Sequence, residues 1–394
     1  MKYEFLNLQL DTDKHEFRAG GELQALEPQV FDLLAVLLEN RDRLISRDEL
    51  VEKVWSGRVV SDATIDARIS AARKAVGDSG ESQSVIKTVP RRGFRFIAEV
   101  ISGDGEGDGG ALAPDAQRQK IQFCRSFDAT RIAFGRSGSG PPIVRAGHWL
   151  THLEYDWRCP IWQPFLSELS RTYSLLQYDQ RGNGLSDWQV EDLSLEAFVA
   201  DLEAVVDAAG LDQFAIIASS QGVPVSVAFA TRHADRVTHL VLHGGFAKGR
   251  MLRAAAAERE QAEAYMTLMR HGWGADGSPF LQAFSSLYIP DGTHEQIESL
   301  AEQQRITTSP ENAVRLRRAF DNFDVTDLLP EVVAPTLITH ARNDGIHPLD
   351  QGRELAASIR DAELVVLETR NHVVLRQDPT WPVFFQAVHH HIPL

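Results

Sequence analysis

Apolar and polar residues alternate at the start of the chain and then recur at helical spacing. The first hundred residues therefore predict a small sheet, three helices and a hairpin. The alternation places Tyr3, Phe5, Leu8 and Leu10 on one face of the sheet. A helix begins at Pro28, since the first turn of a helix tolerates proline. Its apolar residues recur three and four positions apart: Val30, Leu33, Leu34, Leu37 and Leu38.

Two more helices and a hairpin follow. Ser46 and Glu49 form a capping-box pattern for a helix that runs to about Trp55. A third helix begins near Ser61 and stops at Gly77. Its inward stripe is Ile65, Ile69, Ala72 and Val76, and we expect its opposite face to expose Thr64, Arg68, Arg73 and Lys74. Segments 85–89 and 94–97 predict two strands joined by the basic turn Pro90-Arg91-Arg92-Gly93.

Beyond residue 117, apolar strands alternate with amphipathic helices, which predicts a mostly parallel sheet covered on both faces. The expected strands are 121–127, 131–135, 143–146, 174–178, 214–217, 238–243, 336–340 and 364–367. A helical insertion interrupts this alternation at about 246–327. The predicted fold class of this larger part is α/β.

A composition change separates these two parts. Residues 102–115 read SGDGEGDGGALAPD, which is glycine-rich and acidic with almost nothing to bury, so we expect a flexible connector. The length of 394 residues suits two domains. We expect a first domain at 1–101, a linker at 102–117 and a second domain at 118–394.

The composition, with 43% hydrophobic and 24% charged residues, is that of a globular protein. No run of 18 apolar residues occurs, and the first residues mix charged and apolar groups unlike a signal peptide. We therefore expect a soluble, cytoplasmic protein with no membrane partner. Cys124 and Cys159 lie in no CxxC pattern and are expected to be buried free thiols. His389-His390-His391 cannot all face one ion from a helix, so we expect a surface helix end, no metal and no cofactor.

The negative charge is unevenly distributed along the chain. The formal net charge of −15 argues against indiscriminate nucleic-acid binding by the whole chain. Residues 1–100 nevertheless carry only −2, and the stretch from Arg58 to Ala98 carries +4. This stretch contains the third helix and the hairpin, and it favours contact with double-stranded DNA. A solvated basic face is the alternative.

The first hundred residues resemble the OmpR/PhoB-type winged-helix effector domain. The resemblance rests on EPQVFDLLAVLLENRDRLISRDELVEKVW, DATIDARISAARKAVGD and IKTVPRRGFRF. In that family the third helix reads bases and the hairpin, or wing, contacts the backbone. The resemblance therefore implies DNA contacts by Thr64, Arg68, Arg73, Lys74, Thr88, Arg91 and Arg92. Ser70 and Ala71 depart from the family, in which these helix positions are often basic.

Three residues of the second part form a candidate catalytic triad. The motif ASSQG, with Ser220 at its centre, follows the fifth expected strand and precedes a helical stretch. A nucleophile elbow needs small residues two before and two after the serine, and Ala218 and Gly222 meet that need. Asp344 follows the seventh strand and His372 the eighth. In this order Ser220 would attack, His372 would carry its proton, and Asp344 would hold the imidazole tautomer.

An oxyanion needs two backbone donors, which we expect from Gln221 and from the loop Gly147-His148-Trp149, where Trp149 is favoured. His148, Trp149, Tyr155 and Trp157 are candidate ligand-pocket residues, with core packing as the alternative for the aromatic ones. Residues 120–390 resemble the α/β-hydrolase superfamily, in the branch with D-x-R-G-x-G-x-S, here Asp179–Ser186. They are particularly similar to hydrolase-like domains fused to bacterial regulators, through RSGSGPPIVRAGHWLTHLEYDW and QYDQRGNGLSDW. That resemblance implies sensing of a small molecule. Together the two resemblances imply an α/β fold class with an N-terminal winged helix-turn-helix and a C-terminal α/β-hydrolase fold, in which the insertion at about 246–327 forms a helical lid.

Two functions fit these features. The first is a ligand-responsive transcription regulator in which the hydrolase-like domain binds, and slowly hydrolyses, a small molecule. The second is a serine hydrolase of an ester or lactone whose winged helix is accessory. The expected partners are double-stranded DNA, a small-molecule ligand or substrate, and a second copy of the chain in a homodimer.

Overall fold

The structure is a computed structural model that describes residues 2–393 except 7, 13, 21, 42–43, 56–59, 81–82, 90–91, 99, 104–118 and 275–276. The chain folds into two compact units, residues 1–110 and 111–394, each with its own hydrophobic core. The expected linker lies almost entirely outside the described residues. Ser102 and Gly103, which we expected in that linker, instead pair with Tyr3 and Lys2 in a strand of unit 1. No helix among the described residues is long and apolar enough to cross a membrane.

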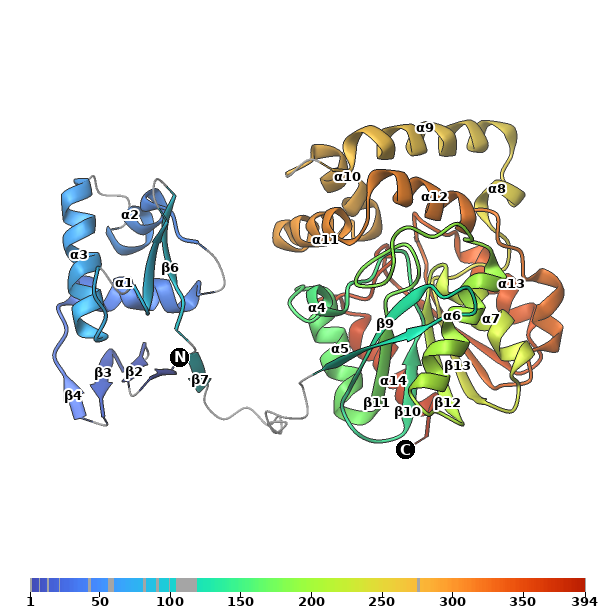
Figure 1. Ribbon diagram of the computed structural model, residues 1–394, viewed down its shortest axis with the longest axis horizontal. Helices are drawn as coiled ribbons and strands as arrows, with labels where there is room; N and C mark the ends of the chain where they lie inside the picture. The colour runs from blue at the N-terminus through green and yellow to red at the C-terminus, as the bar shows by residue number, and fades with distance from the viewer. Residues whose placement is uncertain are drawn as a thin grey trace. The chain divides into compact units, whose positions relative to one another are not determined.

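Unit 1 opens with an antiparallel sheet in the order β4-β3-β2-β1-β7 (Figure 1). Its strands are β1 (Lys2–Phe5), β2 (Leu8–Asp11), β3 (Glu16–Ala19), β4 (Glu22–Gln24) and β7 (Val100–Gly103). The alternation seen in the sequence holds, because Tyr3, Phe5, Leu8 and Leu10 are buried. The last strand of the unit, β7, is therefore an edge strand of the sheet and pairs with the first strand, β1.

Three helices follow the first four strands in the chain: α1 (Pro28–Glu39), α2 (Arg47–Trp55) and α3 (Asp62–Ala75). The predicted start signals are confirmed. Ser46 Oγ accepts from the Glu49 amide at 3.2 Å, and the Glu49 side chain accepts from the Ser46 amide at 3.4 Å. Ser61 Oγ accepts from the Thr64 amide, and Gly77 follows the end of α3 with φ of 72°.

The hairpin of β5 (Ile86–Val89) and β6 (Gly93–Phe96) completes unit 1. Its second strand is held near the turn by paired backbone hydrogen bonds between Ile45 and Phe94, at 2.8 and 2.9 Å. Gly93 sits at φ of 137°, and a Cβ there would collide with the carbonyl of Ile45, so only glycine fits. Phe94 and Phe96 enter the core of the unit. The hairpin is thus held rigidly against the link between α1 and α2.

Unit 2 is built on an eight-stranded sheet in the order β15-β14-β13-β12-β10-β11-β9-β8. Every strand predicted from the sequence is present, and all pairs are parallel except those made by β9 with β8 and β11. The strands are β8 (Lys120–Arg125), β9 (Arg131–Ser137), β10 (Pro142–Arg145), β11 (Ser174–Tyr178), β12 (Phe214–Ser219), β13 (Val237–His243), β14 (Thr336–Ala341) and β15 (Ala362–Leu367).

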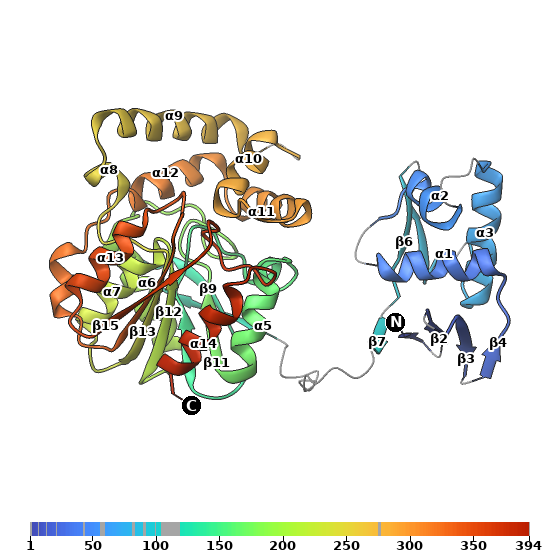
Figure 2. The same cartoon turned by 180° about the vertical axis from the view of Figure 1, so that it is seen from behind.

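Helices cover both faces of this sheet, as a mostly parallel sheet requires. On one face lie α5 (Trp162–Thr172) and α14 (Trp381–His391), joined by contacts of Phe165 with Phe384 and Phe385 (Figure 2). On the other lie α6 (Leu195–Ala208), α7 (Gly222–Arg232) and α13 (Leu349–Ser358) (Figure 1). Short segments α4 (Leu153–Asp156) and η1 (Thr326–Glu331) complete the layers.

The predicted lid region is helical. It contains α8 (Arg250–Arg253), α9 (Ala256–Gly272), α10 (Pro279–Tyr288), α11 (His294–Thr307) and α12 (Pro310–Phe320), which lie together at one end of the unit (Figures 1 and 2). These cap helices reach the core through aromatic contacts, including those of Trp149 with Phe284 and of His372 with Tyr288. The cap therefore closes over the edge of the sheet that carries Ser220, Asp344 and His372.

Candidate functional sites

The hairpin of unit 1 presents a compact basic surface. Lys87 and Arg95 stand opposite each other on β5 and β6, and both are exposed. Arg92, at the turn, is exposed as well, whereas Arg91 lies outside the described residues. Like charges directly opposite on paired strands destabilise a sheet, and a phosphate between them would offset this repulsion. Lys87 and Arg95 were not among the predicted contacts, although their alternation with inward apolar residues could have identified them.

The exposed face of α3 differs from the expected one. Its solvent-facing residues recur every three to four positions and are Asp62, Ala63, Asp66, Ala67, Ser70 and Lys74. Arg68 is only half-exposed, and its guanidinium pairs with Glu27 at 2.9 Å and donates to Gln29 at the start of α1. Thr64 is half-buried, and its hydroxyl contacts Ser61. Of the four helix residues that we predicted to be exposed, Lys74 alone is fully so.

Arg73 was expected on the exposed face and is instead buried, so that expectation is wrong. Its guanidinium donates to the carbonyl of Ile86 at 2.7 and 3.1 Å and to the Thr88 hydroxyl at 2.8 Å. A long arginine stem packs against apolar surface while its donors reach backbone oxygens, which a helical-wheel argument does not anticipate. Arg73 thus joins α3 to the hairpin, and Thr88 is its partner rather than an open surface group.

Ser220 occupies a strained turn between β12 and α7. Its φ is 55°, in the left-handed region that residues with a side chain rarely adopt. A Cβ on Gly222 would collide with the carbonyl of Gly147, so a larger residue there would break the turn. The geometry is that of a nucleophile elbow, which exposes a serine hydroxyl at the carboxyl edge of a sheet.

Asp344 and His372 meet on the same edge of the sheet. Asp344 Oδ2 accepts from His372 Nδ1 at 2.7 Å, and its other oxygen accepts from the amides of Ile346 and His347 at 2.7 and 3.1 Å. Burial alone would raise the pKa of Asp344, but His372 and these two amides hold it below its usual range. A carboxylate can only accept a hydrogen bond, so the His372 proton is on Nδ1, and Nε2 is left as a proton acceptor.

A second imidazole lies beside the serine. Ser220 Oγ is 3.4 Å from His347 Nε2, and among the described residues no hydrogen bond joins this hydroxyl to His372. His347 Nδ1 faces an Arg253 nitrogen at 3.5 Å. Because arginine can only donate, Nδ1 accepts, and the His347 proton is on Nε2, directed at the serine. His347 is therefore a donor to Ser220, and the sequence reading missed it.

His243, at the end of β13, fixes the backbone of His372. Its Nε2 donates to the His372 carbonyl at 3.0 Å, and its Nδ1 accepts from the Thr339 hydroxyl at 2.9 Å. The His372 amide in turn donates to the carbonyl of Tyr288 at 2.8 Å. Burial, with a smaller effect of His372, lowers the pKa of His243 to about 3, so this ring is neutral. A histidine at the end of an apolar strand was the sequence signal for this residue.

Of the two predicted oxyanion donors, Trp149 lines the cavity beside Ser220, whereas Gln221 follows Ser220 in the chain without lining that cavity. Gln221 precedes α7, and Trp149 lies in the loop after β10. Among the described residues, neither the Gln221 nor the Trp149 amide donates a backbone hydrogen bond. The Trp149 ring is held by its indole nitrogen, which donates to Gln304 of α11 at 3.0 Å. Neither amide therefore has to give up a backbone partner in order to bind an oxyanion.

A cavity of about 40 Å³ opens beside Ser220 and His372. His148 and Trp149, two of the four predicted pocket residues, line it, together with Trp162, Tyr288 and two glutamines of α11. Tyr155 and Trp157 do not line it, and that prediction is wrong. The Tyr155 hydroxyl instead contacts Ser299 on α11 at 3.1 Å, and Trp157 packs half-buried against the core. Closeness in sequence to His148 and Trp149 was therefore not enough to predict that these two rings line the cavity.

A buried ion pair supports the floor of this cavity. Arg145, the last residue of β10, pairs with Asp156 at 3.2 Å and stacks on the Trp162 ring. Its guanidinium also donates to His148 Nε2, so the proton of that neutral ring is on Nδ1. Burial, then the Arg145 charge, holds the pKa of His148 well below its usual range. An arginine inside an apolar strand was the overlooked signal for this group.

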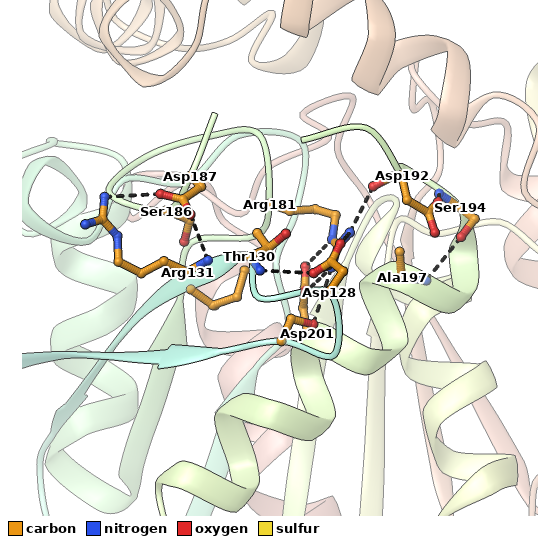
Figure 3. A network of polar contacts seen from close by, with 12 residues as sticks. Asp128, Thr130, Arg131, Arg181, Ser186, Asp187, Asp192, Ser194, Ala197 and Asp201 are labelled. Carbon is orange, nitrogen blue, oxygen red and sulfur yellow. Dashed lines mark hydrogen bonds and ion pairs between the residues drawn. The ribbon is translucent and has the colours of Figure 1, made fainter. Parts of the chain in front are cut away.

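The D-x-R-G-x-G-x-S motif forms a structural turn rather than a reactive group (Figure 3). Arg181 is fully buried and makes two hydrogen bonds to Asp201 of α6, at 2.6 and 2.7 Å. It also donates to Asp128 at 2.9 Å and to the carbonyl of Asp192 at 3.0 Å. One guanidinium thereby ties the turn between β8 and β9, α6 and the loop after β11 together.

The remaining candidate residues lie apart from this cavity. His389, His390 and His391 occupy the last turn of α14, as predicted, and His389 contacts the Tyr173 hydroxyl at 3.2 Å. Cys159 is buried, whereas Cys124 is only half-buried. Within the described part of the chain, no three metal-ligating side chains gather in one place.

Comparison with known proteins agrees with the two units. Residues 21–96 match the family described as transcriptional regulatory protein, C terminal, and residues 149–379 match the alpha/beta hydrolase fold family. The transcriptional activator CadC of Escherichia coli K12 is 34% identical over 88 residues, which are 22% of this chain and 17% of CadC. The putative carbamate hydrolase RutD of Escherichia coli O157:H7 is 26% identical over 231 residues, covering 55% of this chain and 81% of RutD.

Solved structures similar to unit 2 show the same fold. A hydrolase from Pseudomonas aeruginosa PA01 gives a TM-score of 0.58 at 21% identity, covering 70% of this chain and 98% of the hydrolase. The enol-lactonase from Burkholderia xenovorans LB400 gives 0.54 at 22% identity, covering 68% of this chain and 99% of the lactonase. The chain belongs to the α/β hydrolase fold family and joins that domain to an N-terminal OmpR/PhoB-type winged-helix domain of transcriptional regulatory proteins.

Proposed function

We propose that unit 2 binds a small molecule beside Ser220 and that this binding shifts the affinity of unit 1 for DNA. The fusion of a transcriptional regulator's DNA-binding domain to an α/β hydrolase domain supports a regulator. The observation that carries the proposal is the cavity lined by Ser220 and His372 in the same chain as an exposed basic hairpin. A ligand acts on DNA binding only if its affinity differs between the two states of the protein.

The chemistry available at the cavity is acyl transfer. Ser220 rotates from His347 toward Nε2 of His372 and attacks the acyl carbon, while His372 takes the hydroxyl proton. The Asp344 carboxylate stabilises the imidazolium that forms, 2.7 Å away. The Gln221 and Trp149 amides would hold the oxyanion, and His372 then returns its proton to the leaving group. The cavity of about 40 Å³ holds only a few water molecules, so substrate entry requires the cap helices to move.

The contacts with DNA are assigned to unit 1. Arg92, Lys87 and Arg95 would meet phosphates, while the exposed face of α3, with Ser70 and Lys74, would lie in the major groove. The acidic Asp62 and Asp66 on that face are screened by Arg47, which pairs with them at 3.3 and 2.6 Å. The proposal includes a homodimer, which multi-angle light scattering of the full chain tests.

The test uses the DNA upstream of the protein's own coding sequence in a gel-shift titration of the full chain. A serine-directed fluorophosphonate, bound covalently at Ser220, serves as the occupant of the cavity. We expect labelling to change the DNA affinity at least about fivefold, the lower end of typical coupling between sites. Ser220→Ala protein, treated in the same way, is the matched control and should keep its affinity. Equal affinities of labelled and unlabelled protein, or no shift at low salt, would refute the proposal.

A free-standing serine hydrolase is the second candidate. The Asp344–His372 hydrogen bond and the strained Ser220 backbone favour it, because a binding protein needs neither. RutD is named a putative carbamate hydrolase, and the similar structures include an esterase and an enol-lactonase. An ester or lactone is therefore the proposed substrate class. Turnover of 4-nitrophenyl acetate that is lost in Ser220→Ala and unchanged by DNA would favour this candidate over the regulator.

A further inference from the structure

The wall of the cavity beside Ser220 is mainly apolar. It includes the rings of Trp149, Trp162, Phe165 and Tyr288, together with aliphatic side chains of α11 and of the segment that follows His372. A wall of this kind covers an apolar group and leaves the orientation of a ligand to the few polar atoms that reach it.

Two glutamines of α11 border the same cavity, but both are already engaged. Gln303 accepts from the indole of Trp162 at 3.0 Å and donates to Asp156. Gln304 accepts from the indole of Trp149 at 3.0 Å and donates to a serine of α10 at 2.8 Å. These two amides therefore hold the aromatic wall in place, because their oxygens are taken by the indoles.

His148 presents a hydrogen-bond donor to this cavity. Arg145 donates to its Nε2, which leaves the proton of the neutral ring on Nδ1. Among the described residues, no group pairs with Nδ1, and the atom is not sealed in the interior of the unit. His148 lines the cavity and is only 5% exposed, so a partner for this N–H has to come from the cavity. A buried donor without a partner is unfavourable, which favours a ligand that supplies an acceptor.

A buried ion pair holds the His148 ring in this tautomer. Arg145 and Asp156 pair at 3.2 Å, with side chains that are 6% and 1% exposed. Burial lowers the pKa of Arg145 and raises the pKa of Asp156 to about 6, so the interior disfavours both charges. Such a pair stabilises a fold little more than apolar groups of the same volume would. Apolar groups could not fix the proton of His148 on Nδ1, and Arg145 is therefore a positioning residue for His148.

A fixed N–H donor in an apolar wall selects for one acceptor atom. We propose that His148 Nδ1 determines specificity, and that it selects an acyl compound whose acyl part is apolar except for a second carbonyl oxygen, which accepts this hydrogen bond. This inference rests on the proposed function, that unit 2 binds a small molecule beside Ser220, and names the class of that molecule. The acceptor is neutral, because the charge of Arg145 is already balanced by Asp156. An analogue without this oxygen leaves the N–H without a partner, which is how such a site discriminates.

The test measures binding to full-length Ser220→Ala protein by isothermal titration calorimetry, without DNA and without turnover. The probes are ethyl 4-oxopentanoate and ethyl 5-oxohexanoate, and their controls, ethyl pentanoate and ethyl hexanoate, lack only the keto oxygen. We expect at least one keto ester to bind about fivefold or more tightly than its control, as one hydrogen bond in a buried site implies. The preferred chain length places the second carbonyl relative to the ester.

Two substitutions in this background assign the preference to Nδ1. In His148→Gln the amide oxygen reaches the position of Nε2 and accepts from Arg145, but the donor at Nδ1 is lost. The keto preference should then disappear, while the control esters bind as before. In His148→Asn the amide nitrogen takes the position of Nδ1, so this variant should retain most of the preference. His389→Gln, at a half-buried histidine of α14 that lies apart from the cavity, is the matched control.

Nitrogen-15 NMR of the full chain, labelled at histidine, reports the tautomer itself. Nδ1 of His148 should carry the proton and Nε2 should not, and the keto ester should shift the Nδ1 signal. The signal is assigned by its absence from His148→Gln or His148→Asn. Arg145→Met removes the donor to Nε2, so the two tautomers should mix and the keto preference should weaken. Thermal melts verify folding, and the preference of the parent protein for keto esters remains testable if a variant unfolds.

Four results would overturn the proposal: no binding of either keto ester, equal binding of keto and control esters, a proton on Nε2 of His148, or an equal loss in His389→Gln. A His148→Gln variant that keeps the preference, or that weakens keto and control esters alike, would do so as well. Failure of the proposed function looks different. If keto esters bind as expected but leave the gel shift unchanged, the role of His148 stands and ligand control of DNA binding does not. If the fluorophosphonate changes the gel shift while keto esters fail to bind, the reverse holds.

Discussion

Replacing Asp344 with asparagine tests the assignment of His372 as the base that activates Ser220. The two oxygens of Asp344 have distinct roles, since Oδ2 accepts from His372 Nδ1 and Oδ1 accepts from the amides of Ile346 and His347. In Asp344→Asn the carbonyl oxygen would keep the two amides, which only donate. The amide nitrogen would then face His372 and donate to Nδ1, which moves the ring proton to Nε2. A protonated Nε2 cannot accept the proton of Ser220.

The expected loss is large because two effects act together. The variant holds the wrong tautomer, and it removes the buried carboxylate, 2.7 Å from the imidazole, that stabilises the imidazolium. The same exchange in a serine-protease triad lowers turnover about 10⁴-fold, or about 5 kcal/mol at 1.36 kcal/mol per factor of ten. Asp344 and His372 are both buried here, so we expect Ser220 to react with a fluorophosphonate at least about 10³-fold more slowly in Asp344→Asn.

The assay is the pseudo-first-order rate of labelling, with Ser220→Ala as the baseline and a thermal melt as the check on folding. His347→Gln is the informative comparison, because His347 also contacts Ser220. As a donor it contributes one hydrogen bond, worth about 1 kcal/mol, so His347→Gln should change the rate less than about tenfold. Labelling of Asp344→Asn within tenfold of the parent, or a loss in His347→Gln as large as in His372→Gln, would refute this reasoning.

Four further outcomes follow from the contacts described. Arg181→Met leaves Asp201 buried without its partner and should cost about 3–5 kcal/mol in urea unfolding, whereas Arg342→Gln, at an exposed pair, should leave the melting temperature unchanged. Lys87→Ala and Arg92→Ala should each reduce the slope of log affinity for DNA against log salt by about 1, with unchanged slopes counting against phosphate contact. Arg73→Met should lower the free energy of unfolding of unit 1 by about 2 kcal/mol, because the buried Ile86 carbonyl loses its hydrogen-bond donor. The slope of log DNA affinity against log salt should stay the same in this variant. The free energy of unfolding of unit 2, measured in urea, should fall as the pH is lowered from 7 to 5. A free energy that stays constant or rises over this range would contradict the dominance of the buried histidines.

Most of the fold could be predicted from the sequence because its signals are local. The strands of unit 2 are short apolar runs, and each helix start in unit 1 has a local signal, Pro28 for α1 and the caps Ser46 and Ser61 for α2 and α3. The linker estimate erred at Ser102 and Gly103, since pairing with β1 depends on a partner a hundred residues away. Local composition cannot indicate such a partner, because Ser102 and Gly103 begin a glycine-rich acidic stretch that is typical of a connector.

The candidate sites were less predictable, because their residues are arranged by tertiary contacts. Ser220, Asp344 and His372 could be found since chain order and strand ends place them on one edge. His347 had no such signal, being one polar residue in a loop. The helical pattern placed Arg73 wrongly on the exposed face, because it treats every arginine as outward-facing. The long stem of arginine permits a buried guanidinium. A sequence pattern thus identifies the elements that carry a site more reliably than it identifies which side chains enter it.

Opposing titrations decide how unit 2 responds to acid. His148, His243 and His347 are buried, and burial holds the pKa of each below the usual 6.5. Below pH 6.5 these three imidazoles therefore bind protons in the unfolded chain but stay neutral in the folded chain. Stability is then lost as pH falls, at about 4 kcal/mol per pH unit for the three together. Burial raises the pKa of Asp156 and of Asp179 to about 6, so between about pH 6 and 4 the folded chain retains two protons that the unfolded chain releases. Their contribution has the opposite sign and reaches about 3 kcal/mol per pH unit. Burial also lowers the pKa of His340, which adds to the histidines, and raises the pKa of Asp201, which adds to the aspartates. Four imidazoles then oppose three carboxyl groups, so the histidines outweigh the aspartates and make the hydrolase unit sensitive to acid.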